Sequence, residues 1–359
     1  MAPKKIRVAV LYGGKSAEHE VSVRSARSIL DSLDPERFEA IPVGIDRNGS
    51  WYLSPPTLPL QEQGEEVSLL PHRPELVSIE AGTNKPVDVV FPVLHGPLGE
   101  DGTVQGFLEL ANIPYVGAGV LASAIGMDKD VTKRLLSVAG LRVAPSRSYI
   151  SKQVAIEAFE ELVEDLGSRI YVKPANLGSS VGVSKVIDRD SYEAGVASAF
   201  GYDTKIIVES EIVGREIECS VLGNDHPIAS VPGEIRPADG FYSYEAKYLD
   251  DGAELIIPAD LTDIETEAIQ RVAVDSFTAI CCSGMARVDM FLRASGEVVV
   301  NEINTIPGFT NISMYPKLWE ASGIGYEELV SRLIDLAIER HDRRSQLSTR
   351  YEPDRDTSA

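Results

Sequence analysis

The sequence of 359 residues has few cysteines and no long apolar run, and these two shortages restrict the class of protein. Its three cysteines, Cys219 and the adjacent Cys281 and Cys282, are an odd number and lack the spacing of metal ligands. They support neither structural disulfides nor a zinc site. No apolar stretch approaches the ~20 residues that cross a bilayer, and the N-terminus lacks the apolar core of a signal peptide. We therefore expect no membrane partner and a location in the reducing cytoplasm.

Positive charge is also scarce. The 34 lysines and arginines stand against 55 aspartates and glutamates, which gives a formal net charge of -21 and a pI near 4.7. Binding to a nucleic-acid backbone needs clustered cations, so the composition argues against nucleic acid as a partner. We attribute the acidic excess mainly to solubility. The hydrophobic content of 43% is ample for two or three cores, so we expect a multidomain globular protein.

Residues 1–120 show the pattern of an α/β domain with a parallel sheet. Val8-Ala-Val-Leu-Tyr12 is a short apolar run that Gly13-Gly14 ends, and a helical stretch over residues 22–33 follows. Residues 87–94 form a second apolar run, typical of a buried parallel strand. Between these elements, residues 54–86 are rich in Pro, Gly and Glu and predict a surface excursion with weak strands.

The rest of the chain predicts two smaller α+β units and a tail. The second domain, residues 121–208, is expected to contain a helix at 128–140 and strands at 171–174 and 206–209. The third domain, residues 209–345, is expected to contain a strand at 216–222, a helix at 263–282, and two strands joined by a tight turn near Ser295-Gly296. The polar residues 346–359 predict a disordered tail. The expected fold class is therefore α/β and α+β, in three domains.

Two carboxylates are predicted to face each other in the hairpin of the third domain. If Ser295-Gly296 are its two turn residues, Leu292 pairs with Val299, and the same register places Asp289 opposite Glu302. Carboxylates directly opposite each other repel and lower stability unless a cation lies between them. The pairing therefore indicates a cation site, provided that the short hairpin does not slip by one residue.

The cation of this hairpin can be inferred from its ligands. Arg287 and Asn304 would form the neighbouring pair on the same face as Asp289 and Glu302, because side chains two apart on a strand share a face. Oxygen ligands without histidine or thiolate select Mg²⁺ or Mn²⁺ and leave positions for water and phosphate oxygens. The alternative is a solvated hairpin in which Arg287 neutralises the acids.

A loop of small residues follows a lysine in the second domain. Lys173 ends an apolar strand, and Gly178-Ser-Ser-Val-Gly182 follows, with amides and hydroxyls that can close over phosphates. Such a loop alone is often only a turn, but with Lys129 and the acidic hairpin it predicts a Mg-nucleotide site. A loose P-loop pattern at residues 9–16 is weak, because Val10-Leu-Tyr12 belong to the buried strand and cannot also wrap a triphosphate.

Several segments together resemble the D-alanine-D-alanine ligase family of the ATP-grasp superfamily, over roughly residues 6–340. Six segments carry the resemblance, in order: GGKSAEHEVS at 13–22, HGPLGEDG at 95–102, MDK at 127–129, KPANLGSSVG at 173–182, YEAKY at 244–248 and NEINTIPG at 301–308. Each segment is moderately specific by itself. Six in order predict a three-domain ATP-grasp architecture with an N-terminal parallel-sheet domain.

The resemblance implies an ATP site between the second and third domains. The residues it assigns to the nucleotide are Lys129, Lys173, Ser180, Glu209, Ile212, Glu216 and Lys247. Lys129 and Lys173 would bind the phosphates, residues 209–212 would lie along the adenine, and Glu216 would accept hydrogen bonds from the ribose hydroxyls. The metal ligands would be Asp289, Glu302 and Asn304, which would hold two Mg²⁺ ions, with Mn²⁺ as a possible substitute.

The implied reaction converts the carboxylate of one D-alanine to an acyl phosphate, which the amine of a second D-alanine attacks. The product, D-alanyl-D-alanine, serves peptidoglycan precursor synthesis. The residues assigned to catalysis are Glu18 for the ammonium of the first substrate, Ser179 and Tyr248 for its orientation, and Arg287 and the Gly308 amide for the tetrahedral intermediate. His95 would act near the first substrate, or would be a hydrogen-bonded structural histidine. Ser313 and Met314 would receive the carboxylate of the second substrate.

Two other functions remain open. Related ligases that use D-lactate or D-serine as the second substrate would keep the same ATP and metal residues, although Tyr248 in the closing segment 237–252 favours D-alanine. A nucleotide-binding regulator without catalysis is the other alternative, but it would not need Arg287, Asp289, Glu302 and Asn304 together. A homodimer is the usual form of the family.

Overall fold

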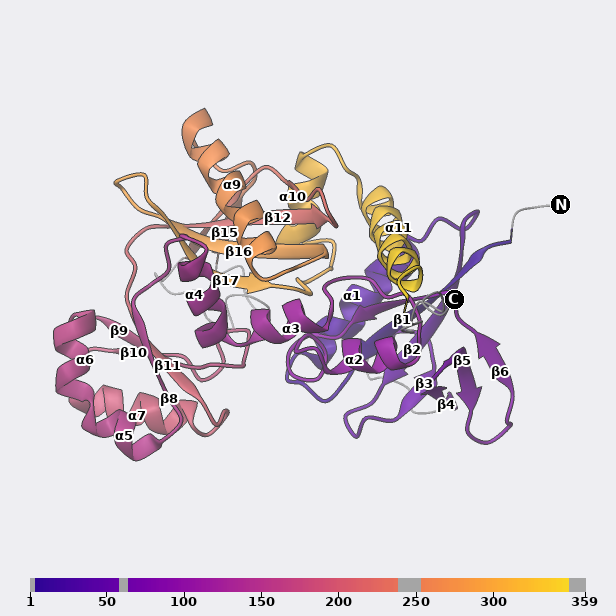
Figure 1. Ribbon diagram of the computed structural model, residues 1–359, viewed down its shortest axis with the longest axis horizontal. Helices are drawn as coiled ribbons and strands as arrows, with labels where there is room; N and C mark the ends of the chain where they lie inside the picture. The colour runs from indigo at the N-terminus through magenta and orange to yellow at the C-terminus, as the bar shows by residue number, and fades with distance from the viewer. Residues whose placement is uncertain (1–3, 58–63, 238–252, 349–359) are drawn as a thin grey trace, which may run out of the picture.

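The computed structural model describes residues 4–57, 64–237 and 253–348, and three sheets organise them (Figure 1). The strands are β1 (Ile6–Gly13), β2 (Phe38–Ile45), β3 (Trp51–Leu53), β4 (Glu65–Leu70), β5 (Arg73–Ser78), β6 (Asn84–Pro86), β7 (Val89–Val93), β8 (Ser146–Tyr149), β9 (Ile170–Pro174), β10 (Ser184–Val186), β11 (Ile206–Ser210), β12 (Arg215–Gly223), β13 (Ile228–Ala229), β14 (Gly233–Pro237), β15 (Ala253–Ile256), β16 (Gly284–Leu292) and β17 (Val298–Asn304). The helices are α1 (His19–Asp31), α2 (Thr103–Leu110), α3 (Val120–Met127), α4 (Lys129–Val138), α5 (Lys152–Glu157), α6 (Phe159–Leu166), α7 (Arg189–Ala199), α9 (Asp263–Ala279), α10 (Met314–Ala321) and α11 (Tyr326–Ser345).

The N-terminal sheet has a parallel centre and an antiparallel extension. β1 lies between β2 and β7 and is parallel to both, as predicted. β3 to β6 then extend the sheet beyond β2 in antiparallel order. The predicted parallel sheet is therefore a mixed sheet, and part of the expected surface excursion at 54–86 belongs to it. Its short connections allow only antiparallel neighbours, because a parallel crossover needs a dozen or more residues.

Apolar residues of β1 are buried on both faces of the N-terminal sheet. Val8 and Val10 belong to a core with α1 and α11, whereas Ala9 and Leu11 belong to a core with α2. This pattern explains why the strand reads as one continuous apolar run. It also confirms that the P-loop pattern is misleading, because residues 10–12 pair with β2 and β7.

The second and third sheets are antiparallel. The order β10-β9-β11-β8 forms the second sheet, and α5, α6 and α7 contribute to the apolar core beneath it. The third sheet has the order β15-β14-β12-β16-β17, with β13 added beside β12, and α9 packs against it. The long helix α11 returns to the N-terminal sheet and contacts β7, β12 and β16, so it joins the first and third sheets (Figure 1).

The hairpin β16–β17 confirms the two predicted polar pairs but not the predicted turn. Asp289 faces Glu302 and Arg287 faces Asn304. Leu292, however, pairs with Val298 and not with Val299. The loop is longer than predicted because Gly296 adopts a left-handed φ of 81°. A register shift between Asp289 and Met290 then restores the predicted pairs.

Two helices differ from the predicted bounds for local reasons. α1 begins at His19 and not at Ser22, because the Ser22 hydroxyl accepts a hydrogen bond from the Gly13 N–H (2.8 Å) and serves the preceding turn. α9 ends at Ala279, since Cys281 takes a left-handed φ of 57° that stops the helix. The predicted tail at 346–359 lies largely outside the described residues. None of the helices in the described part of the chain is long and apolar enough to cross a membrane.

Candidate nucleotide and ligation site

A cavity of about 300 Å³ lies between the second and third sheets. Nine of the predicted residues line it: Lys129, Lys173, Ser179, Ser180, Glu209, Ile212, Glu216, Asp289 and Glu302. The lysines come from α4 and β9, whereas the two metal-type carboxylates come from β16 and β17. The cavity therefore combines cationic groups from α4 and β9 with acidic groups from β11, β12, β16 and β17. This is the distribution that a nucleotide with divalent cations requires.

Lys129 is fixed at the start of α4. Its backbone N–H donates to the Ala175 carbonyl (3.0 Å), its Nζ donates to the Leu177 carbonyl (2.6 Å), and the same Nζ lies 3.5 Å from Glu302 Oε2. Asp128 caps the helix by accepting from the N–H groups of Asp130 and Val131. Lys129 thus links the second sheet to the acidic hairpin.

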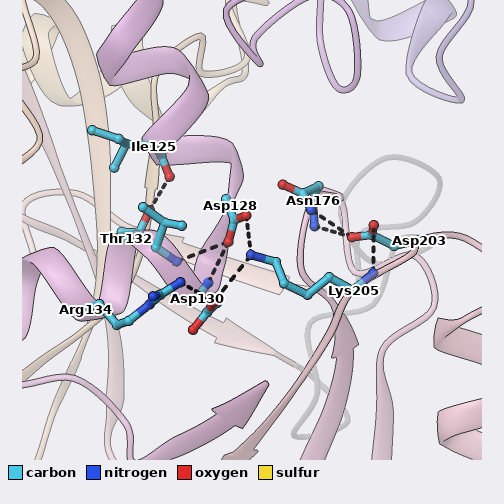
Figure 2. A network of polar contacts seen from close by, with 9 residues as sticks. Ile125, Asp128, Asp130, Thr132, Arg134, Asn176, Asp203 and Lys205 are labelled. Carbon is cyan, nitrogen blue, oxygen red and sulfur yellow. Dashed lines mark hydrogen bonds and ion pairs between the residues drawn. The ribbon is translucent and has the colours of Figure 1, made fainter. Parts of the chain in front are cut away.

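A polar network holds this end of α4 against the second sheet (Figure 2). Lys205, next to β11, contacts Asp128 and lies 3.3 Å from Asp130 Oδ2. Asp203 accepts hydrogen bonds from the backbone N–H (2.7 Å) and the side-chain amide (3.0 Å) of Asn176. Because Asn176 lies two residues before the loop of small residues, the network places both Lys129 and that loop.

The loop itself has an unusual backbone. Ser179 and Ser180 both lie in the left-handed region, with φ of 53° and 58°. Non-glycine residues rarely adopt this conformation, and where they do it is often at ligand sites. The Ser179 hydroxyl donates to the Glu18 carboxylate from the N-terminal domain. The loop therefore joins the cavity to the predicted substrate residue Glu18.

Glu18 is placed by the tight turn after β1. A Cβ on Gly13 would lie 2.3 Å from the Ile45 carbonyl oxygen, and Gly13 has a φ of 93°, so only glycine fits there. The Gly14 N–H donates to the same carbonyl (2.8 Å). Glu18 lies at the N-cap position of α1, and its side chain reaches Ser179, which is distant in sequence.

Glu209 on β11 is held between two lysines. Lys133 Nζ lies 3.0 Å from Glu209 Oε2, and Lys173 contacts Oε1. Burial alone would raise the pKa of Glu209, but the two cations outweigh it and hold the pKa at about 2. Glu209 is therefore ionised at neutral pH. Sequence reasoning missed Lys133, although it follows Lys129 by one helical turn.

Three carboxylates form a row across neighbouring strands of the third sheet. Glu218 on β12 pairs with Asp289, which pairs with Glu302. Arg287 balances two of them, since its Nε lies 2.7 Å from Asp289 Oδ1 and 2.9 Å from Glu218 Oε2. Burial would lower the pKa of Arg287, but these carboxylates raise it well above its ordinary value. Sequence reasoning missed Glu218, because only the pairing of β12 with β16 brings it here.

The amide of Asn304 completes the predicted metal set. Its Nδ2 donates to Asp289 Oδ2 (2.9 Å), so its Oδ1 is the atom that can ligate a cation. Within the described residues no three His, Cys, Asp or Glu side chains converge as a metal cluster. The chemistry of this set, two carboxylates and one amide oxygen, fits Mg²⁺, which keeps several positions for water and phosphate.

His95 is buried at the end of β7, near Glu18 and Arg287. Its Nδ1 lies 3.1 Å from the Ile306 carbonyl oxygen, and its Nε2 has no hydrogen-bond partner among the described residues. Burial lowers the pKa of His95, although the Glu18 charge opposes this. The ring is therefore neutral at neutral pH.

Glu100 is a third group, after Lys133 and Glu218, that sequence reasoning left without a role. It lines a narrow cavity next to the main one, with Lys129, Glu302 and Asn304, and accepts a hydrogen bond from the Gly96 N–H (2.9 Å). Burial and the Glu18 charge raise the pKa of Glu100 to about 8. It therefore holds a proton at neutral pH.

Of the remaining predicted residues, some lie in the described part of the chain and others lie outside it. Ser313 lies beside Gly308, because a Cβ on Gly308 would be 3.1 Å from its Oγ, and it accepts a hydrogen bond from the Thr310 N–H (3.0 Å). Met314 is buried with Ile235 and Leu318 in a small apolar core. Lys247 and Tyr248, with most of the segment 237–252, lie outside the described residues.

Fold and site together define the class of protein, a nucleotide-binding enzyme of ATP-grasp architecture. A family model described as D-ala D-ala ligase N-terminus matches residues 7–118, and one described as D-ala D-ala ligase C-terminus matches residues 135–335. The chain belongs to the D-alanine-D-alanine ligase family. It is 48% identical over 360 residues to a D-alanine-D-alanine ligase of Shouchella clausii, with 96% of this chain and 98% of the relative covered.

Solved structures are similar over the same length. A D-alanine-D-alanine ligase from Coxiella burnetii has a TM-score of 0.86 at 40% identity, covering 96% of this chain and 97% of that one. A VanG D-Ala:D-Ser ligase from Enterococcus faecalis has a TM-score of 0.85 at 37% identity, covering 93% of this chain and 100% of that one. The second similarity shows that the fold alone does not define the second substrate.

Proposed function

We propose that this chain joins two D-alanine molecules to D-alanyl-D-alanine, at the expense of ATP, in the cytoplasm. One observation carries the proposal: Ser179, in the loop of small residues, contacts Glu18. A group that can bind an ammonium therefore adjoins a cavity suited to a triphosphate. An enzyme that phosphorylates an amino-acid carboxylate needs both groups side by side. The relatives named above support the assignment of D-alanine.

In this proposal ATP lies in the cavity between the second and third sheets. Lys129 and Lys173 bind its phosphates, Ser180 contributes to the loop over them, and Lys247 completes the set. The adenine lies along residues 209–212, and Glu216 accepts the ribose hydroxyls. Asp289, Glu302 and Asn304 would hold two Mg²⁺ ions, which neutralise the triphosphate when bound.

The side chains of the site then orient the substrates for two successive reaction steps. Glu18 binds the ammonium of the first D-alanine, and Ser179 and Tyr248 keep Glu18 in place. The carboxylate of this substrate attacks the γ-phosphorus, which forms an acyl phosphate and releases ADP. The free amine of the second D-alanine attacks the carbonyl carbon, the C–N bond forms, and phosphate leaves with its electron pair.

Charge develops on the carbonyl oxygen in the second step. Arg287 and the Gly308 amide are the donors that would stabilise it, and losing one such donor typically lowers the rate by about 10² to 10³. The attacking amine loses one proton, and His95, neutral and with Nε2 directed to no described partner, is suited to accept it. Ser313 and the backbone of Met314 would bind the second carboxylate.

The arrangement of the chain around the site is also part of the proposal. Residues 1–120, 121–208 and 209–345 would form the three domains, and the segment 237–252 would close over the site and exclude water that hydrolyses acyl phosphate. We further propose a homodimer.

The experiment is ATP-dependent phosphate release by the purified chain with Mg²⁺, and the products are identified by mass. The chain receives D-alanine, L-alanine, or D-alanine mixed with D-lactate or D-serine. We expect release with D-alanine alone and the dipeptide as product. A product formed only from a mixture would contradict the second substrate, and no turnover in any mixture would favour the regulator without catalysis. Glu18→Gln should lose turnover while retaining ATP binding, which separates the two halves of the site.

A further inference from the structure

Lys133 is a buried cation beside the proposed nucleotide cavity, but it is not part of the cavity wall. It lies on α4 with a side chain only 4% exposed, and its Nζ is 3.0 Å from Glu209 Oε2. Lys173 contacts the other oxygen of the same carboxylate. Of the two cations that share Glu209, only Lys173 lines the cavity.

Two lysines around one carboxylate are more than neutrality requires. A single cation would balance the buried Glu209, and each further buried charge carries a desolvation penalty that only a partner offsets. The extra cation is therefore explained if one of the two lysines has a second partner part of the time. Lys173 is the lysine with access to such a partner, because it faces the cavity.

The strand register explains how Lys173 can change partners. Lys173 pairs with Ile207, and Tyr171 pairs with Glu209, so Lys173 and Glu209 share one face of the sheet at diagonal positions. Lys173 directly precedes the last residue of β9, and the loop of small residues begins at Gly178. Lys133, in contrast, projects from a helix whose start is fixed by Asp128.

We propose that Lys133 is the permanent counter-ion of Glu209 and thereby frees Lys173 to bind the nucleotide phosphates. This inference rests on the proposed nucleotide site. When Lys173 moves to a phosphate oxygen, Glu209 keeps a partner in Lys133 and remains ionised without penalty. Without Lys133, nucleotide binding would leave a buried carboxylate unpaired, which is strongly unfavourable. Lys133 is a positioning residue, because it acts through Glu209 and touches no substrate.

The test measures the Kd of ATP by titration calorimetry on the full chain, with Mg²⁺ and without D-alanine. Lys133→Met removes the charge at similar length and should raise the Kd by about 10- to 100-fold. In a Glu209→Gln background residue 209 no longer needs a counter-ion, so the same change should raise the Kd by less than about threefold. Lys152→Met, at an exposed position on α5, is the matched control and should leave the Kd unchanged.

The outcomes distinguish a counter-ion role of Lys133 from a purely structural one. An equal loss of affinity from Lys133→Met in both backgrounds would assign Lys133 a structural role only and overturn the inference, as would an unchanged Kd. Circular dichroism and thermal melting check folding, and if Lys133→Met does not fold, Lys133→Gln replaces it in the same comparison. If the unmodified chain binds no ATP, the proposed function itself is contradicted.

Discussion

At the scale of single residues, Glu100 shows how burial sets a charge state. Its pKa of about 8 in the folded chain exceeds the ordinary value of 4.5, because burial and Glu18 disfavour its ionised form. Between these two pH values the folded chain keeps a proton that the unfolded chain loses. Glu100 therefore lowers the free energy of unfolding as pH rises from about 4.5 to 8, by at most about 1.4 kcal/mol per pH unit.

Glu100→Gln removes this titration and should flatten the pH dependence. We expect the variant to gain stability relative to the unmodified chain as pH rises from 5 to 8, measured by urea unfolding without Mg²⁺ or ATP. The charged groups that act on Glu100 are Glu18, Lys129 and Glu302, and all remain in the variant. Glu80→Gln, at an exposed position, is the control. Parallel pH profiles for the two variants would refute the assignment.

At the scale of one element, α9 depends on its cap. The Thr262 hydroxyl accepts from the Glu265 N–H (3.3 Å), and the Glu265 carboxylate accepts from the Thr262 N–H (2.9 Å), which is a complete capping box. Thr262→Ala should lower the free energy of unfolding by about 1 kcal/mol. α9 packs on the third sheet but does not line the cavity, so turnover should not change. Urea unfolding and the phosphate-release assay check both parts, and Thr262→Ser should retain most of the stability.

The hairpin β16–β17, at the same scale, shows which part of a strand pairing a local pattern predicts. Alternating polar residues predict that Asp289, Glu302, Arg287 and Asn304 share a face, and the structure confirms it. The sequence pattern does not reveal the register shift beside Met290, because a bulge depends on how the strand packs in the whole sheet. The predicted loop is one residue too short, and the predicted pairing omits the register shift. These two errors cancel, so the pairs of site residues are predicted correctly.

At the scale of the whole molecule, the cavity walls come from different sheets, so ATP should stabilise the chain as a unit. Ligand at a hundredfold excess over Kd adds about 2.7 kcal/mol to the folded state, which corresponds to a rise of several degrees in Tm. We expect this rise with Mg²⁺ and ATP in a thermal melt. Lys173→Met should reduce it strongly, whereas Lys152→Met should not. An equal rise in both variants would place ATP elsewhere.

Long-range contacts explain what sequence reasoning missed. Lys133 looks like an ordinary surface lysine on an amphipathic helix, and only the approach of β11 shows that it is buried against Glu209. Glu218 and Glu100 likewise gain their roles from neighbours far along the chain. Interactions of this kind depend on the packing of separate elements, and local patterns do not encode them.

The sequence by itself determined the main elements, the opposed carboxylates of the hairpin, the glycine turn after the first strand and the resemblance to a ligase family. These features follow from local physics, because strand alternation, helix caps and left-handed turns involve residues close together in the chain. Only the tertiary structure decided that Ser179 meets Glu18 and that Glu209 lies between Lys133 and Lys173. Burial and charge at these contacts depend on elements that meet only when the three sheets assemble.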